Sequence, residues 1–230
     1  MAAVVTADIG GVDDLPLAPV AQRGVDVDWW YFTDDPEQCA PEPWRTEYVQ
    51  PVWPEEANLS AKVYKMLPQP DVGRDVVWID ANMQVVSPDF VAEALDCRRD
   101  GIAVFTHPRR HNVYQEAEAS LGAESQGGKY EPWRDRIRDQ MHGYVIDGFA
   151  EDRLYACGTV AWDWSHVAAL TVGTAWLVEC ARWSPQDQLS FPYVLGRYGV
   201  TPGVFPFGQL ERRDANYFGN RWWRLHQHRR

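Results

Sequence analysis

Apolar residues recur along the chain with two different periods, and each period is typical of one kind of element. Short apolar or alternating runs predict β-strands, at residues 2–9, 25–33, 45–49, 75–80, 101–106 and 154–162. Apolar residues three or four positions apart predict helices, at residues 57–67, 88–97, 112–122, 133–144, 165–182 and 187–197. The tail 203–230 is expected to be irregular. Because strands and helices alternate over most of the 230 residues, the pattern predicts an α/β fold, a single-domain α/β/α sandwich with a mostly parallel central sheet.

The run DVVWIDANMQVVSPDF at residues 75–90 ends a predicted core strand on two polar side chains, Asp80 and Asn82. In open α/β sheets, ligands bind at the carboxyl ends of the strands. Carboxylate and amide oxygens one residue apart suit a Mg²⁺ or Mn²⁺ ion that holds a diphosphate. The simpler alternative is that Asp80 caps a turn. Ser87 is expected to be the N-cap of the next helix, with Pro88 at its first position.

Three further polar clusters follow predicted strands or stand near the C-terminus. Residues 106–120 (THPRRHNVYQEAEAS) form either an exposed helix with paired charges or a phosphate-binding segment, for which arginine is suited. Asp187, at the start of the helix 187–197, is either an ordinary first-turn acid or a carboxylate delivered to the sheet edge. His226 and His228 are either simply exposed or complete a metal site begun by Asp80.

The net charge is −11, which argues against a general nucleic-acid binder. The charge is uneven, however. Residues 1–60 hold 12 acidic residues against two arginines, whereas residues 211–230 hold six arginines against two acids. The basic C-terminal end is therefore either a solvated tail or a place where an anionic partner binds.

The four cysteines are scattered without a C-x-x-C pair, which predicts free thiols in a reducing compartment. The N-terminal MAAVVTADIGG lacks a basic region and is expected to be a first strand, not a signal peptide. No apolar segment approaches the roughly 20 residues that span a membrane. The sequence therefore predicts a cytoplasmic protein without a membrane span. The glycine motifs of dinucleotide-binding folds and P-loops are absent.

Eight short motifs occur in order along the chain: TADIGGVDDL (6–15), FTDD (32–35), KVYKMLP (62–68), VWIDANMQV (77–85), HPRRHNVYQEA (107–117), QMHGY (140–144), GTVAW (158–162) and DQLSFPYVL (187–195). Together they resemble the glycosyltransferase-like family of plant pectin and mucilage biosynthesis proteins and its bacterial relatives. The resemblance implies a GT-A type, Rossmann-like fold in one domain over residues 1–230. Residues 1–106 would form roughly the nucleotide-binding part and residues 107–230 the acceptor and sugar part.

The resemblance also implies a reaction, in which a metal-dependent enzyme moves a sugar from a nucleotide-diphosphate sugar, with UDP favoured, to a hydroxyl acceptor. The implied donor-binding residues are Thr6, Gly10, Gly11, Asp34, Lys62, Lys65, Asp80, Asn82, His107, Tyr114 and Gln188. The implied catalytic residues are Asp187, Glu116 and Arg110. A Mn²⁺ or Mg²⁺ ion would bind at Asp80, Asn82, His226 and His228.

Three positions depart from the family pattern. Gln69 stands where many relatives have a histidine, and two other positions keep an alternative function open. Asn82 replaces the second acid of a D-x-D-like motif, and Gln186 stands where the family has an arginine. These changes motivate an alternative function, a nucleotide-sugar binding module that has lost catalysis. The acceptor is either a glycan or a hydroxymethylated base in DNA, as for phage glucosyltransferases, and the basic segment 129–138 is compatible with DNA. Stereochemistry and oligomeric state stay open.

Overall fold

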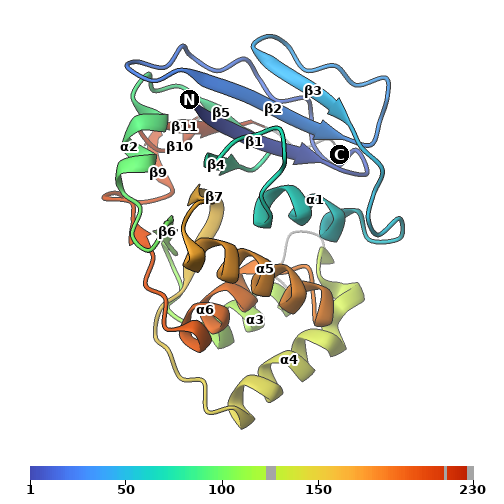
Figure 1. Cartoon of the computed structure of the whole chain (residues 1–230). Coiled ribbons are helices and arrows are strands. Elements are labelled where there is room, and N and C mark those ends of the chain that lie inside the picture. Colours follow the sequence, from blue (N-terminus) through green and yellow to red (C-terminus); the bar gives the residue numbers. More distant parts are fainter. Residues whose placement is uncertain (123–127, 215–216, 227–230) are drawn as a thin grey trace.

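The computed structural model describes residues 1–122, 128–214 and 217–226, and its main feature is a seven-stranded sheet (Figure 1). The strand order is β3-β2-β1-β4-β7-β6-β8. These strands are β1 (Ala2–Asp8), β2 (Val27–Thr33), β3 (Trp44–Tyr48), β4 (Asp75–Ile79), β6 (Ile102–Thr106), β7 (Tyr155–Asp163) and β8 (Gly203–Val204). All neighbouring pairs are parallel except those of β7, which runs antiparallel to β4 and β6. The predicted α/β class and largely parallel sheet are therefore confirmed, with one reversed strand.

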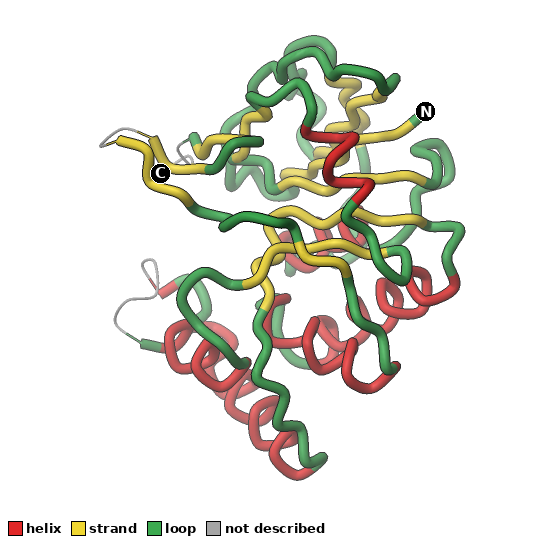
Figure 2. The backbone as a smooth tube through the Cα atoms, turned by 90° about the vertical axis from the view of Figure 1, so that its left-hand side faces the viewer, coloured by secondary structure: helices red, strands yellow, loops and turns green. Residues whose placement is uncertain are grey.

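The helices are α1 (Ala57–Met66), α2 (Phe90–Asp96), α3 (Val113–Leu121), α4 (Arg134–Ile146), α5 (Val167–Arg182) and α6 (Asp187–Tyr198), and a 3₁₀ turn, η2 (Glu131–Trp133), leads into α4. Side chains of α1 and α5 share one core layer with the sheet, and side chains of α2 share the opposite layer. Figure 2 shows α2 in front of the strands, with α3, α4, α5 and α6 gathered in the lower half of the molecule. The sheet thus has helices on both faces, as predicted for a single-domain sandwich.

Strand β1 shows why this sequence takes a central place in the sheet. All seven of its residues are buried, because it lies between two parallel neighbours and is covered on both faces. Ala3 and Val5 face the layer of α1 and α5, while Ala2 and Val4 face the layer of α2. Burial of each valine side chain stabilises the fold by about 1.5–3 kcal/mol before entropy is counted.

The C-terminal region is not irregular, so that expectation was wrong. A second, four-stranded sheet has the order β5-β11-β10-β9, formed by β5 (Met83–Val85), β9 (Glu211–Asp214), β10 (Tyr217–Gly219) and β11 (Trp223–Leu225). Trp222 and Trp223 are fully buried, and the Trp222 ring packs edge-on against Phe90 of α2. Because β11 pairs with β5 from the middle of the chain, no local sequence period could show this sheet.

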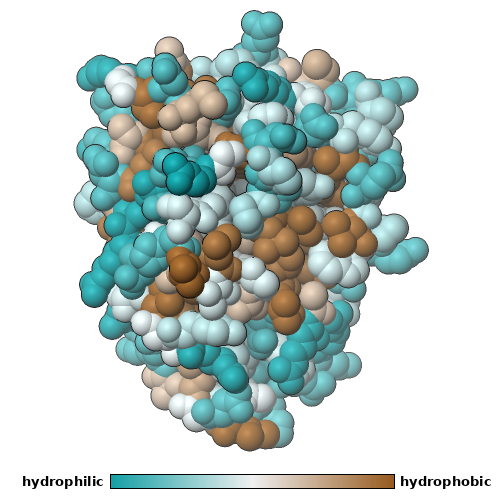
Figure 3. All heavy atoms as spheres, viewed as in Figure 1, coloured by the Kyte–Doolittle hydropathy of each residue, from teal (hydrophilic) through white to brown (hydrophobic). Residues whose placement is uncertain are grey.

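Three smaller features complete the description. The predicted cap at Ser87 was misplaced, since α2 begins at Phe90 and the Ser87 hydroxyl accepts from the Asp89 amide in the turn before it. No helix in the described part of the chain is long and apolar enough to cross a membrane. Figure 3 shows apolar side chains gathered over α5, where Val167 and Val178 are exposed.

Candidate functional site

The carboxyl ends of β1, β2, β4 and β6 meet at one edge of the sheet, because these strands run in the same direction. Each ends in a predicted or newly found polar residue: Asp8 closes β1, Asp34 follows β2, Asp80 follows β4, and His107 follows β6. The first residue of α6, Asp187, comes to the same region from the other half of the chain. The candidate site therefore draws on both parts of the domain.

At its centre two lysines of α1 share one carboxylate of α6. Lys62 Nζ lies 3.0 Å and Lys65 Nζ 2.7 Å from Oδ2 of Asp187. All three residues are buried, and the lysine side chains are only 10% and 4% exposed. Spacing by three residues places both lysines on one face of α1, which is why they converge on the same oxygen. The cluster carries a net positive charge inside the protein.

Burial and ion pairing act in opposite directions on this cluster. Burial raises the pKa of Asp187, but the charges and hydrogen bonds of Lys62 and Lys65 outweigh it and hold the pKa well below its usual range. Burial lowers the pKa of Lys65, while the charges of Asp187 and Asp80 outweigh it and raise the pKa above the ordinary lysine value. Each shift favours the charged form. At neutral pH Asp187 and Lys65 are therefore a fixed ion pair, and Lys62 completes the lysine–aspartate triplet.

Asp80 lies beside this triplet and keeps one oxygen open. Its Oδ1 accepts a hydrogen bond of 2.9 Å from the Trp78 indole and lies 3.7 Å from Lys65 Nζ. Its Oδ2 points toward Gly158, because a Cβ added at that glycine would lie 3.0 Å from this oxygen. The Asp80 side chain is 45% exposed. Asp80 is thus a partly exposed carboxylate next to a buried cluster with a net positive charge.

A second buried network surrounds Glu116 on α3. Its Oε2 accepts a short hydrogen bond from Arg110 Nε, and its Oε1 accepts from Gln186 Nε2 at 2.9 Å. Burial raises the pKa of Glu116, while Arg110 opposes the rise. His107 lies against the same carboxylate, and burial together with the Arg110 charge lowers its pKa to about 4, so it is neutral at pH 7. Arg110, 29% exposed, is the member that reaches solvent.

Sequence reasoning missed Asp8, although it is 3% exposed at the end of β1. Its Oδ1 accepts from the amides of Val12 and Asp13, at 2.9 and 3.3 Å. Its Oδ2 is buried and finds no hydrogen-bond partner in the described part of the chain. Burial raises the pKa of Asp8 more than the two amide hydrogen bonds lower it, and the charge of Asp34 raises it further. The only signal in the sequence was an acid ending an apolar strand, which equally suits a turn.

Asp34 and Gly10 are brought together as predicted for one subsite. The Gly10 amide donates to Asp34 Oδ1 at 2.9 Å. Gly10 and Gly11 have φ of +84° and +64°, values that favour glycine. A Cβ at Gly10 would lie 2.7 Å from the Cβ of Ala57, whereas nothing lies within 4 Å of a Cβ at Gly11. The two neighbouring glycines therefore form a matched pair for mutagenesis.

We expect Gly10→Ala to lower the free energy of unfolding more than Gly11→Ala. Both variants place a side chain at positive φ, at a cost of about 1–2 kcal/mol. Gly10→Ala adds a steric clash, for about 1–3 kcal/mol more, and displaces the amide that binds Asp34. Urea denaturation of both variants measures the difference, and equal losses would contradict it.

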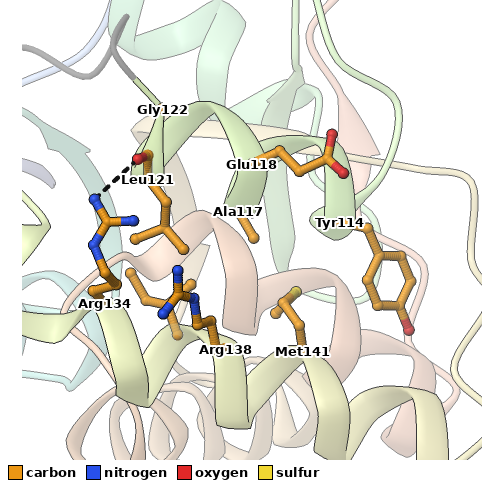
Figure 4. A pocket seen from close by; sticks show the side chains of 9 residues that line it. Tyr114, Ala117, Glu118, Leu121, Gly122, Arg134, Arg138 and Met141 are labelled. Atoms are coloured by element: carbon orange, nitrogen blue, oxygen red, sulfur yellow. Dashed lines mark hydrogen bonds between the residues drawn. The ribbon is translucent and has the colours of Figure 1, made fainter.

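Three predicted residues stand apart from the centre of the site. Thr6 is fully buried within β1, and its hydroxyl has no hydrogen-bond partner within residues 1–122, 128–214 and 217–226. Gln188 donates to the carbonyl of Tyr155 at the start of β7. Tyr114 lies two residues before Glu116, hence on the opposite side of α3, and its hydroxyl donates to the Phe149 carbonyl. It lines a groove of about 430 Å³ between α3 and α4 (Figure 4), where Arg134 donates to the Leu121 carbonyl.

The predicted metal ligands are partly brought together. His226 follows β11, and its amide donates to the Asn82 carbonyl at 2.9 Å, so the C-terminal strand reaches the segment after Asp80. Nε2 of His226 is buried and has no hydrogen-bond partner among the residues that the structure describes. His228 lies outside the described residues. Among the residues the structure describes, no group of three or more His, Cys, Asp or Glu side chains is arranged to hold a metal ion.

Comparison with known proteins gives one family. The family model described as TOD1/MUCI70, glycosyltransferase-like domain, matches residues 43–216, well over half of the chain. The matched range contains the lysine–aspartate triplet, Asp80 and Glu116, but neither Asp8 nor His226. A search of curated proteins found no match.

Proposed function

Since the chain belongs to the TOD1/MUCI70 glycosyltransferase-like family, we propose that it transfers a sugar from a nucleotide-diphosphate sugar to a hydroxyl acceptor. The observation that carries the proposal is the buried triplet of Lys62, Lys65 and Asp187 beside the open carboxylate of Asp80. It lies at the carboxyl edge of a largely parallel sheet, where nucleotide ligands bind in such folds. We assign the sheet to the GT-A type on the same grounds.

The donor is proposed to lie along this edge, with its diphosphate near Lys65. As the bond between the sugar C1 and the phosphate oxygen breaks, negative charge grows on the diphosphate, and a preorganised ammonium stabilises that charge. Asp187 is then a positioning residue, because its Oδ2 already accepts from both lysines. This revises the catalytic role expected from the resemblance. Asp8 and Asp34, at the ends of β1 and β2, offer hydrogen-bond acceptors for the nucleoside of the donor. We favour uridine as this nucleoside, and therefore a UDP-sugar as the donor.

The residues around Asp80 fit a divalent cation held jointly with a diphosphate. Mg²⁺ and Mn²⁺ are commonly bound through one or two protein carboxylates together with phosphate oxygens. Asp80 Oδ2, the Asn82 segment and the unpartnered His226 Nε2 are the groups that would hold the ion. When bound, the ion would neutralise charge on the leaving diphosphate. An ion site that is completed by the donor diphosphate would have low metal affinity when no donor is bound. This agrees with the absence of a three-residue metal-binding cluster among the described residues.

For the acceptor we favour a glycan hydroxyl over a base in DNA. The segment 129–138 looked basic in sequence, but its arginines are engaged within the protein. Arg134 pairs with Glu131, Arg136 lies 3.7 Å from Glu56, and Arg138 lies 3.4 Å from Asp135. Neutralised arginines release few counterions from a nucleic acid, so they supply little affinity. With a net charge of −11, DNA binding would need another surface.

A thermal-shift screen of UDP-, GDP- and TDP-sugars, each with and without Mn²⁺, tests the function. We expect one donor to raise the melting temperature, and to do so more with Mn²⁺, because a ligand that binds only the folded state stabilises it. Release of free sugar from that donor would then exclude the degenerate binding module. No shift with any donor, at concentrations up to millimolar, would contradict the proposal.

A further inference from the structure

We propose that Trp78 is a positioning residue that fixes the orientation of the Asp80 carboxylate for the metal-bound diphosphate; this inference rests on the proposed function. The two residues lie two apart at the end of β4, so their side chains lie on the same face of the extended chain. The Trp78 Nε1–H donates to Asp80 Oδ1 at 2.9 Å. The motif VWIDANMQV contains this tryptophan, but neither the motif nor the polar pattern of the sequence gives it a role.

Because of this hydrogen bond, the two carboxylate oxygens of Asp80 have different surroundings. Oδ1 is occupied by the indole and lies 3.7 Å from Lys65 Nζ. Oδ2 is directed toward Gly158. A Cβ at this glycine would lie 3.0 Å from Oδ2, 2.6 Å from Met83 Cε and 2.9 Å from Gln209 Nε2, so only a glycine leaves room for the oxygen there. Within the described residues no hydrogen bond or ion pair occupies Oδ2. An Asp80 held in this way presents a single, fixed oxygen to a ligand.

Trp78 is itself fixed by packing in the core, so it can keep the Asp80 carboxylate in one orientation. Its side chain is 4% exposed and belongs to the core layer beneath α1 and α5. Lys65 Nζ lies 5.6 Å from the centre of the Trp78 ring and equally 5.6 Å from that of Trp176, so the ammonium is placed between two indoles. The same tryptophan thus contacts both the carboxylate and the cation of the site. Groups that orient a metal-binding carboxylate commonly contribute 10–100-fold to metal affinity.

Trp78→Phe removes the N–H donor and keeps an aromatic ring, and Trp162→Phe is its matched control. Trp162 is fully buried in the same core layer, at the far end of β7 from Asp80, and none of the described residues forms a hydrogen bond with its Nε1. Both variants leave a comparable cavity. We expect a similar loss of thermal stability from both, but a roughly tenfold weaker Mn²⁺ affinity, measured by electron paramagnetic resonance with UDP present, only for Trp78→Phe.

A second substitution separates the hydrogen bond from the shape of the ring. Incorporating β-(3-benzothienyl)alanine at position 78 replaces the N–H by sulfur and preserves the bicyclic ring. We expect it to bind Mn²⁺ as weakly as Trp78→Phe while unfolding near the temperature of the parent. If either variant binds Mn²⁺ as tightly as Trp162→Phe, the positioning role of Trp78 is wrong. If the parent itself binds no Mn²⁺ in the presence of UDP, the metal dependence of the proposed function fails as well.

Discussion

Asp187→Asn should be among the most destabilising single substitutions in this chain, lowering the free energy of unfolding by about 3–5 kcal/mol. The change removes the carboxylate that lies within 3.0 Å of both Lys62 Nζ and Lys65 Nζ, and leaves two buried ammonium groups. Asp80, 3.7 Å from Lys65, is a partial substitute and is half exposed. The midpoint of urea unfolding at pH 7, with the slope compared to that of the parent, measures the loss.

Two further variants show whether the charges serve stability or function. Lys62→Met leaves the Lys65–Asp187 pair intact, so we expect a much smaller loss than for Asp187→Asn. The triple variant Lys62→Met, Lys65→Met and Asp187→Leu removes the whole triplet, and buried ion clusters replaced by apolar residues are often neutral or stabilising. We expect it to regain most of the stability but to bind no nucleotide sugar. A triple variant that still binds donor would contradict the role given to the lysines.

The effect of Asp187→Asn should also depend on pH in a defined direction. The folded-state pKa of Asp187 lies below its unfolded value of 3.8, so its ion pairs contribute full stability above that pH and lose it below. The difference between parent and variant should therefore be constant above about pH 5 and shrink at lower pH. His107 acts on both proteins alike, because its pKa of about 4 in the folded state makes unfolding more favourable as the pH falls below 6.5.

Most of the fold could be predicted because its elements have local signals. The strand at 75–80 and the helix at 165–182 carry apolar periods that are decided within a few residues, and the structure has β4 at Asp75–Ile79 and α5 at Val167–Arg182. The small sheet could not be predicted, because β5 and β11 are short and pair with each other from distant parts of the chain. The reversed direction of β7 is equally a property of the assembled sheet.

The residues of the candidate site could be predicted where they belong to a sequence motif. They could not be predicted where their role depends on tertiary packing. The resemblance placed Lys62, Lys65, Asp80 and Asp187 in one site. In the structure each of these charged groups lies within 3.7 Å of an oppositely charged member of the set. The resemblance did not show that the lysines share a single oxygen, which depends on how α1 and α6 meet. Asp8 and Trp78 read as an ordinary strand end and a core residue, since nothing local distinguishes a buried indole that holds a carboxylate.

Asp80→Ala is expected to have the largest effect on ligand binding, with loss of the Mn²⁺-dependent part of donor affinity. The proposed ion and diphosphate depend on Oδ2, the oxygen that no other described residue engages. The free energy of unfolding should fall by about 1–3 kcal/mol, because the buried Trp78 N–H loses its acceptor, while the backbone bond from the residue 80 amide to the Gly158 carbonyl remains. Calorimetric titration of UDP-sugar with and without Mn²⁺ measures the affinity.

Asp75→Ala provides the matched control for this substitution. Asp75 begins the same strand, its side chain is 44% exposed, and it also contacts a basic residue, Arg98, but it lies at the opposite edge of the sheet. We expect Asp75→Ala to bind donor like the parent at every Mn²⁺ concentration, while Asp80→Ala responds to Mn²⁺ no longer. Residual donor affinity in Asp80→Ala, independent of metal, would report what the Lys62–Lys65 cluster supplies alone. If Asp80→Ala keeps the parent's Mn²⁺ response, the ion binds elsewhere, and the assignment of Asp80 as its ligand is wrong.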